Sequence, residues 1–397
     1  MNRRDEEIST FARKKKTIAI LTEDMAQRFY LTAELFKGLA SFAHEHTNIL
    51  IRHFSLSSIN IDTDFANCDG IITDVPLDEL TEPIKATGLP IVDLTGEHED
   101  DKDIISVDCD AHKIGVMAAE RFLRRGFTSF AIYGVSDTRF GQHLDDGFTA
   151  TIGKSGHSCT ALYRQLSPSR KEKESLLRKR LPKWVAKLPP HTAVFCHNDD
   201  LARWILNICQ KIGRDVPNDI AVMGCGNDIF ICQLSAVTLS SVDTNMQGIG
   251  YAAMRIMSHV IDNPVKPKKR PIFLVHPVGV FERESTSTYP IDPTWLARLL
   301  QTLDENLKRN FTVPQLAKMS GVSQATLQKA FNKAVGMSAA KYMTTIKLRE
   351  AKRLIDMNKS SLKEISAMLG FSSPAYFSCA YQSFFGHSPS RDFRGIK

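Results

Sequence analysis

The sequence that decides the fold of the C-terminal part occurs twice, as VPQLAKMSGVSQATLQKAF at residues 313–331 and as LKEISAMLGFSSPAYFSCAY at residues 362–381. In each copy a short helical pattern ends at a glycine, Gly321 or Gly370, and a second helical pattern begins after a serine. Glycine adopts a positive φ at little cost, and serine is a preferred N-cap residue. Two copies in register predict a tandem pair of helix-turn-helix motifs rather than unrelated helical hairpins.

The starts and buried faces of these helices follow from the same pattern. The second helix is expected to start at Ser323 in the first copy and at Ser372 or Ser373 in the second. Apolar side chains at helical spacing are expected to be buried. They are Leu327 and Phe331 in the first copy and Phe377 and Tyr381 in the second.

An amphipathic helix is predicted between the copies, over residues 340–357. Its apolar residues are Met343, Ile346, Ala351, Leu354 and Ile355. At 1.5 Å per residue it spans about 27 Å, which approaches the ~34 Å of one DNA turn. Such a spacer would place the two second helices in successive major grooves on one side of a duplex.

The charge of the chain is unevenly distributed. From Thr294 onward there are 16 Lys and Arg residues against 6 Asp and Glu residues, a balance of +10, whereas the rest of the chain carries −3. A basic segment that also contains helix-turn-helix patterns indicates a partner with phosphate groups. We therefore expect the C-terminal quarter to bind double-stranded DNA.

This segment resembles the AraC/XylS family of transcription regulators over about 100 residues. The matching motifs are Ala317-x-x-x-Gly-Val-Ser, Gly370-Phe, Tyr376-Phe-Ser and Gly386-x-Ser-Pro. The resemblance implies that the second helix of each copy contacts DNA. The implied DNA-binding residues are Ser323, Gln324, Ala325, Gln328 and Lys329 in the first copy, and Ser373, Ala375, Tyr376 and Cys379 in the second.

The two copies are expected to contribute unequally. Gln328 has the donor and acceptor for adenine, and Lys329 reaches guanine or a phosphate. In the second copy, Cys379 stands where the family usually has an arginine, and residues 365–390 contain no Lys, Arg, Asp or Glu. This half must use hydroxyl groups, backbone N–H groups and apolar contact with thymine methyls. The first copy should therefore dominate sequence specificity.

Strand-like and helix-like patterns alternate from residue 16 to about residue 281, which predicts βαβ units and parallel sheets. The expected strands are 17–21, 48–54, 70–73, 90–94, 104–107, 129–134, 193–197, 220–224 and 271–275. Nine strands suggest two sheets with a cleft between them. Ligands of open α/β sheets bind beyond the carboxyl ends of the strands, so residues that follow the strands are candidates for a ligand site.

The α/β region resembles the periplasmic-binding-protein-like effector domain of the LacI/GalR family. The matching pieces include Gly126-Phe, Asp146-Gly-Phe, His197-Asn-Asp-Asp-Leu-Ala, Val216-Pro-Asn-Asp-Ile-Ala-Val-Met-Gly and Leu239-Ser-Ser-Val. The LacI/GalR family carries its DNA-binding domain at the N-terminus. The first fifteen residues here are too few to form one, so we expect the C-terminal helix-turn-helix pair to replace it. The resemblance implies a small sugar-like effector.

The sugar anchors of the family are partly absent here. Its arginine falls on Leu144 and its aspartate on Gly226, so the effector is a different or modified sugar, or none. The expected effector-binding residues are Asn198, Asp199, Asn227, Asp228, Arg139 and Asp145, with Asp24, Arg28 and Gln142 as further candidates. Asp199 is also a candidate cap for a helix starting at Leu201.

The boundaries that we predict are a charged tail at 1–15, an effector domain at 16–285, a linker rich in Ser, Thr and Pro at 286–293, and a DNA-binding domain at 294–397. A homodimer is expected because operators are symmetric, and RNA polymerase is a partner if the protein activates. No apolar run suits a membrane span or signal peptide, and the eight cysteines form no zinc motif. We expect a cytoplasmic protein without cofactor or metal.

Three alternatives to a sensing regulator remain. A sugar-processing enzyme lacks support, because the chain has no P-loop, no GxGxxG after the first strand, no HExxH and no GxSxG. An exported solute-binding protein would need a signal peptide and would not need the C-terminal module. A regulator that no longer senses a small molecule is compatible with the missing anchors. The sequence therefore favours a DNA-binding regulator over an enzyme.

Overall fold

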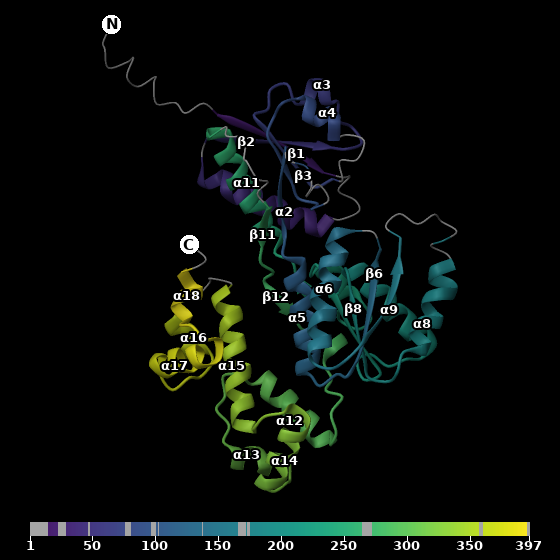
Figure 1. Cartoon of the computed structure of the whole chain (residues 1–397), viewed down its shortest axis with the longest axis vertical. Coiled ribbons are helices and arrows are strands. Elements are labelled where there is room, and N and C mark those ends of the chain that lie inside the picture. Colours follow the sequence, from purple (N-terminus) through teal and green to yellow (C-terminus); the bar gives the residue numbers. More distant parts are fainter. Residues whose placement is uncertain are drawn as a thin grey trace.

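The chain folds into two α/β lobes followed by a group of helices (Figure 1). The predicted fold class, a two-lobed α/β region followed by an all-α tandem helix-turn-helix region, is confirmed. The structure, a computed structural model, describes residues 15–22, 29–46, 48–75, 81–96, 101, 103–136, 138–165, 172, 175–263, 272–356 and 360–394. The predicted tail at 1–15 lies outside these residues except for its last position.

The first lobe is built on a parallel sheet with the strand order β11-β5-β4-β3-β1-β2. Its strands are β1 (Lys16–Thr22), β2 (Ile49–Ser55), β3 (Gly70–Thr73), β4 (Ile91–Asp93), β5 (Ile104–Cys109) and β11 (Ile272–Val275). Its helices are α2 (Phe29–Glu45), α3 (Ile61–Asp64), α4 (Thr81–Ala86) and α11 (Met246–Asp262). Strand β3 is buried throughout, as its uninterrupted apolar sequence predicts.

The second lobe has the strand order β12-β10-β9-β8-β6-β7. Its strands are β6 (Ser129–Val135), β7 (Cys159–Arg164), β8 (Thr192–Cys196), β9 (Ile220–Cys225), β10 (Ser240–Asp243) and β12 (Gly279–Phe281). Its helices are α5 (Ala111–Arg124), α6 (Arg139–Lys154), η2 (Leu176–Arg180), α8 (Leu181–Lys187), α9 (Asp199–Ile212) and α10 (Ile229–Leu234). Only the β10–β12 pair in this sheet, among the residues described, is antiparallel.

Three strands were not predicted from the sequence: β7, β10 and β12. Strand β7 forms an edge of its sheet, and three of its six residues are exposed, so its sequence lacks an apolar run. Strands β10 and β12 have four and three residues. Such short strands are defined by their pairing with neighbours, which a local sequence pattern does not contain.

The chain passes between the lobes after β5, after β10 and between β11 and β12. These three crossings are hydrogen-bonded to one another. The backbone N–H of Asp110 donates to the Val275 carbonyl at 2.9 Å, and the Asn245 amide donates to the His276 carbonyl at 3.0 Å. In the described part of the chain, the lobes are connected through these three segments, so any closure of the lobes must bend them together.

The C-terminal region contains seven helices in the residues described. They are α12 (Thr294–Glu305), α13 (Val313–Met319), α14 (Gln324–Val335), α15 (Ala339–Asp356), α16 (Leu362–Met368), α17 (Pro374–Phe385) and α18 (Pro389–Arg394). Helix α15 supplies Tyr342 and Ile346 to the core around α14, and Leu348 and Ile355 to the core around α17. One rigid helix therefore serves both helix-turn-helix cores, as the sequence predicted.

A search of the described helices for one that is long and apolar enough to cross a membrane found none.

Candidate functional site

Local caps fix where each helix of the repeat begins. The first helix of each copy starts with a capping box, formed by Thr312 with Gln315 and by Ser361 with Glu364. The second helix, α14 or α17, is the expected DNA-reading helix, and we call these two the reading helices. The Ser323 hydroxyl accepts from the Thr326 N–H, which confirms the predicted N-cap. In the second copy Ser373 is the N-cap, which settles the choice between Ser372 and Ser373.

The turns have the same backbone geometry but different surroundings. Gly321 has φ +66° and Gly370 has φ +67°, the left-handed region in which glycine is favoured. A Cβ atom at Gly321 would meet nothing within 4 Å. At Gly370 it would lie 2.1 Å from the carbonyl oxygen of Lys308, which belongs to the segment before the first copy. The second turn is thus packed against the first half of the domain.

Helix α14 buries Leu327 and Phe331, as predicted. Ala325 and Lys329 are exposed, and Gln328 is half-buried. The Gln328 amide donates to Asn332 at 3.0 Å, which holds it along the outer face of the helix. The expected contact residues of the first copy therefore share one accessible face.

Helix α17 buries Phe377 and Tyr381 and presents an uncharged outer face. Tyr376 is 53% exposed, and its ring lies 6.3 Å from that of Phe371. Cys379 is also exposed. The residues expected to contact DNA in this copy therefore lie on the surface, and the only polar groups among them are a phenol, a thiol and the capping serine.

A clamp of three residues joins the two copies. The Lys347 ammonium donates to the Asn310 side-chain oxygen, and the Asn310 amide donates to the Gly370 carbonyl at 2.8 Å. Burial lowers the pKa of Lys347. Asn310 precedes the first copy, Lys347 lies in α15, and Gly370 is the turn of the second copy. The clamp thus ties the segment before the first copy and helix α15 to the turn of the second copy.

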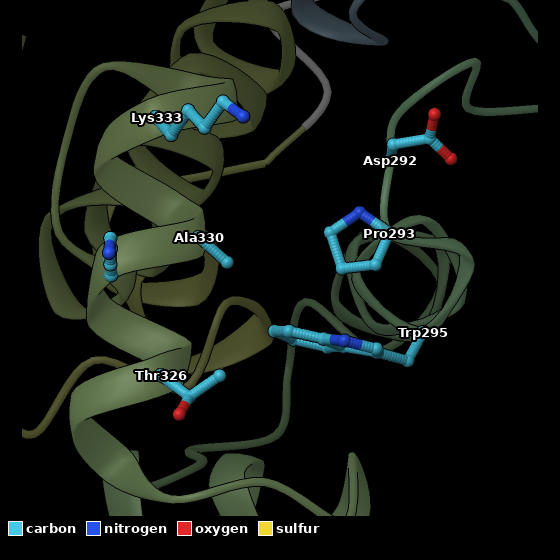
Figure 2. A pocket seen from close by; sticks show the side chains of 7 residues that line it. Asp292, Pro293, Trp295, Thr326, Ala330 and Lys333 are labelled. Atoms are coloured by element: carbon cyan, nitrogen blue, oxygen red, sulfur yellow. The ribbon is translucent and has the colours of Figure 1, made fainter.

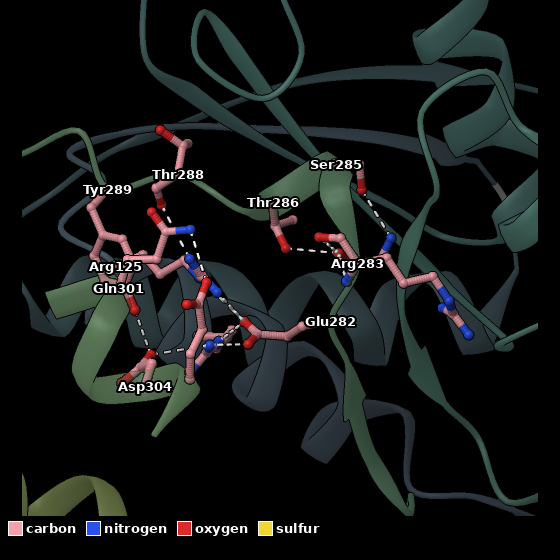
Figure 3. A network of polar contacts seen from close by, with 12 residues as sticks. Arg125, Glu282, Arg283, Ser285, Thr286, Thr288, Tyr289, Gln301 and Asp304 are labelled. Atoms are coloured by element: carbon pink, nitrogen blue, oxygen red, sulfur yellow. Dashed lines mark hydrogen bonds and ion pairs between the residues drawn. The ribbon is translucent and has the colours of Figure 1, made fainter. Parts of the chain in front are cut away.

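A network of charged groups joins the effector lobes to the DNA-binding helices (Figure 3). We call Arg121, Arg125, Glu282, Tyr289 and Asp304 the interdomain network. Glu282 pairs with Arg121 of α5 and with Arg125, the C-cap residue of that helix. Asp304 of α12 pairs with Arg121 at 3.3 Å. The Tyr289 hydroxyl donates to Asp304, and the Arg125 guanidinium lies 4.6 Å from the centre of the Tyr289 ring. Helices α5 and α12 are therefore linked directly.

Helix α15 also contacts the second lobe. Burial, with the nearby charges of Arg121 and Arg349, lowers the pKa of Arg124 to about 10. The side chain of Arg353 lies against Gly279 of β12, where an added Cβ would be 3.1 Å from it. Helix α15, which lies between the two reading helices in the chain, therefore packs against the second lobe.

Asp199 is buried in the second lobe. Its carboxylate accepts from the Ser241 hydroxyl at 2.6 Å and from the Asp228 N–H at 2.7 Å. Burial raises its pKa to about 7, against the opposing effect of these two hydrogen bonds. Asn198, not Asp199, caps α9, which begins at Asp199 and not at Leu201 as expected. The carboxylate of Asp199 thus holds the strand ends of the lobe together.

Asn227 and Asp228 also bind neighbouring protein groups. The Asn227 amide donates to Asp243 at 3.1 Å and accepts from Arg283 at 2.8 Å. Asp228 caps α10. Arg283 was not identified from the sequence because it follows β12, a strand that the sequence did not predict. These residues connect the ends of β9 and β10 with the segment after β12.

Asp145 is bound by His197, a residue that sequence reasoning missed. The His197 ring donates to Asp145 at 2.8 Å from Nε2, and its Nδ1 accepts from the Val135 N–H at 3.2 Å. The Tyr163 hydroxyl donates to the second oxygen of Asp145 at 2.8 Å. A Cβ at Gly134 would lie 2.4 Å from the His197 ring, so this glycine is the local signal for a buried ring.

The remaining expected effector residues lie at the start of helices that follow strands of the second lobe. Arg139 is the first residue of α6. Asn198 caps α9 through its side-chain oxygen, and its amide nitrogen takes no part in that cap. The first lobe approaches these strand ends, because the side chain of Leu31 in α2 lies 3.7 Å from a Cβ built at Gly226. Gln142 lies in the first turns of α6. Asp24 and Arg28 lie outside the described residues.

Two family models match the chain. A periplasmic binding protein-like domain matches residues 119–286, and a helix-turn-helix domain matches residues 316–395. The resemblance to LacI/GalR effector domains and to AraC/XylS DNA-binding domains is thereby confirmed.

Known regulatory proteins are similar to this chain over most of its length. The xylose operon regulatory protein of Escherichia coli (strain K12) is 25% identical over 334 residues, which cover 83% of this chain and 84% of that protein. That of Haemophilus influenzae is 25% identical over 335 residues, with 82% and 84% covered. The structure of a xylose-binding transcription activator has a TM-score of 0.57 and 22% identity, and covers 96% of this chain and 99% of that one.

Proposed function

The chain belongs to the helix-turn-helix transcription regulators that carry a periplasmic binding protein-like domain, and we propose that it reads a two-part operator under the control of a sugar-like effector. The observation that carries this proposal is the clamp between the two helix-turn-helix copies. Because Lys347, Asn310 and Gly370 are bonded together, the two reading helices meet DNA as one rigid unit. A rigid pair fits two adjacent major grooves in a single register.

On the DNA side, we propose that α14 supplies most of the sequence preference. Its outward residues, Ala325, Gln328 and Lys329, include a planar amide and an ammonium, the groups that pair with adenine and guanine. Helix α17 offers Tyr376 and Cys379, which suit thymine methyl groups. Ser323, Gln324, Ser373 and Ala375 lie at the starts of the reading helices, where backbone N–H groups meet phosphates.

On the effector side, we propose that a sugar-like molecule binds between the lobes, beyond the carboxyl ends of β6, β8 and β9. Arg139, Asn198 and Asp228 are the proposed direct contacts. They lie at the N-terminal ends of helices that follow these strands. For Asp145, Asp199 and Asn227, whose side chains bind other side chains of the second lobe, the proposed role is to orient the neighbouring loops. The proposed domain boundaries remain 16–285 for this sensor, 286–293 for the linker and 294–397 for the DNA-binding domain.

The interdomain network is the proposed route between the two functions. Effector binding moves the lobes about their three crossings, and α5 starts at the first of these crossings with its cap residue Asp110. Arg121 in the last turn of α5 and the C-cap residue Arg125 pair with Glu282 and reach Asp304 and Tyr289. A shift of α5 therefore changes the position of α12 and α15 relative to the sensor. Allosteric control requires two such arrangements with different DNA affinity.

We further propose that the protein acts as a homodimer on its operator in the cytoplasm, and that it contacts RNA polymerase if it activates. These proposals rest on its relationship to transcription regulators and on the symmetry of operators.

Two measurements on the full-length protein test the proposal. Binding to fragments of its own upstream region, followed over a salt series, should reveal one preferred fragment and a steep loss of affinity with salt. Thermal unfolding against a panel of pentoses, hexoses and disaccharides should reveal a sugar that raises Tm by mass action. Absence of any preferred fragment would reject DNA recognition. A preferred fragment without a stabilising sugar would instead favour a regulator that has lost small-molecule sensing.

A further inference from the structure

A groove of about 470 Å³ lies between the start of α12 and one flank of the first reading helix (Figure 2). The residues that line it are Asp292, Pro293, Trp295, Thr326, Lys329, Ala330 and Lys333. Figure 2 shows the Trp295 indole extending from α12 toward α14, between Thr326 and Ala330.

The groove lies beside the face that is expected to read bases. Thr326, Ala330 and Lys333 are spaced at four and three residues, so they share one flank of α14. Lys329 lies between this flank and the outward face that carries Ala325, and it lines the groove from its edge. The groove and the reading face are therefore continuous on the surface of the helix.

A helix that enters the major groove has a sugar–phosphate strand on each side. The major groove is about 12 Å wide, which is close to the diameter of a helix with its side chains. The flanks of the helix consequently face the two phosphate walls. The groove runs along one flank of α14, and the start of α12 forms its opposite wall. It therefore lies where one of these two strands would pass.

The charge of the groove suits that occupant. Lys329 and Lys333 are exposed and carry two ammonium groups along the flank. The carboxylate of Asp292 at the upper end points away from α14 (Figure 2). The apolar face of Trp295 suits the carbon atoms of a deoxyribose.

From these observations we propose that one sugar–phosphate strand of the operator runs through this groove, with a phosphate on Lys333 and a deoxyribose against Trp295. The proposal rests on the proposed DNA-binding function and extends its contact surface from the reading helix to α12. Because neither residue faces a base edge, the contact adds affinity without sequence preference. It also makes the linker side of the domain part of the DNA interface.

Salt dependence separates this contact from the others. Each neutralised phosphate contributes about −0.9 to the slope of log K against log salt on duplex DNA. Lys333→Ala in the full-length protein should therefore make the slope less negative by about 0.9 on operator and on unrelated DNA alike. Lys211→Ala removes the same charge from the exposed side of α9 in the sensor and should leave the slope unchanged. An unchanged slope in Lys333→Ala would overturn the proposal.

The indole gives a second, independent measurement. The chain has three tryptophans, so replacing Trp184 and Trp204 by Phe leaves Trp295 as the single fluorophore. Acrylamide quenching of Trp295 should fall severalfold when the operator is added. Equal quenching with and without DNA would overturn the proposal.

Other outcomes are also decisive. If Lys333→Ala kept its salt slope but lost activation of transcription, the groove would bind a protein partner and the proposal would be wrong. Failure of the unmodified protein to prefer any DNA fragment would reject the proposed function itself, and that result is visible before any variant is compared.

Discussion

Arg121 and Asp304 lie 183 positions apart in the sequence, yet the Arg121 guanidinium is 3.3 Å from the Asp304 carboxylate. Arg121 lies in the last turn of the helix that begins at the hinge between the lobes, and Asp304 lies in the first helix of the DNA-binding region. Both side chains are only 11% exposed. The strength of an ion pair that is shielded from solvent changes with small displacements of either helix. A link between the effector lobes and the DNA-binding helices requires this property.

Asp304→Asn should weaken this link. It removes the negative charge beside Arg121 but keeps the shape of the side chain beside Tyr289 and Tyr342. Glu282 still compensates Arg121, so the expected loss in the free energy of unfolding is about 1–3 kcal/mol. Urea unfolding measures it, and the ratio of DNA affinities with and without the effector should change as well.

The matched control for this variant is Asp200→Asn. Asp200 pairs with Arg203 on the surface of α9, where both side chains are about half exposed. Surface pairs of this kind contribute little, so stability should change by less than about 0.5 kcal/mol. Similar losses in both variants would mean that the interdomain network has no special role.

Lys329→Ala should reduce operator affinity strongly, by about 10- to 100-fold, because a good base contact accounts for about 1–3 kcal/mol. Cys379→Ala, at the corresponding place in the second copy, should have an effect of less than threefold. Fluorescence anisotropy on one operator fragment compares the two. The opposite ranking would contradict the prediction that the first copy dominates specificity.

The two turn glycines offer a matched pair of substitutions. Gly321→Ala places alanine at positive φ in open space and should cost about 1–2 kcal/mol in stability. Gly370→Ala has the same φ but also pushes a Cβ atom to 2.1 Å from the Lys308 carbonyl oxygen. It should cost more, and it should disturb the clamp formed with Asn310 and Lys347.

DNA binding distinguishes the two effects. Gly370→Ala should weaken binding to the complete operator more than binding to the half that α14 reads, because the relative orientation of the reading helices changes. Gly321→Ala should not show this difference between complete and half operators. Equal behaviour of the two variants on both fragments would show that the clamp does not set the orientation.

Asp199 predicts a particular pH dependence of stability. Burial raises its pKa in the folded protein to about 7, above the value of about 3.9 for an unfolded chain. The folded state therefore binds more protons between pH 4 and pH 7, and its stability falls as the pH rises through this window. The stability lost in this way is on the order of 4 kcal/mol at most, and the loss is complete above pH 7.

Asp199→Asn removes this titration. Compared with the unmodified protein, the variant should lack that part of the decline between pH 4 and pH 7, although it loses one acceptor for the Asp228 N–H. Urea unfolding at several pH values provides the comparison. Parallel pH profiles for the two proteins would show that Asp199 titrates normally in the folded state.

Features that depend on neighbouring residues in the chain were predicted well. The tandem helix-turn-helix pattern, the cap at Ser323, the buried residues Leu327 and Phe331 and the helix between the copies follow from helical periodicity and from serine and glycine chemistry. The strands with uninterrupted apolar sequences were also predictable. Each of these features is encoded within about twenty residues.

What only the tertiary structure decided concerns residues that are distant in sequence. In the folded chain, Asp145 accepts hydrogen bonds from His197 and Tyr163, and Asp199 is buried beside Ser241. Arg121 forms an ion pair with Asp304. The tertiary structure also formed the edge strand β7 and the three-residue strand β12. The physical reason is that a carboxylate has the same local sequence signal whether it faces solvent, a ligand or a buried donor. Its environment is set by which segments the fold brings beside it.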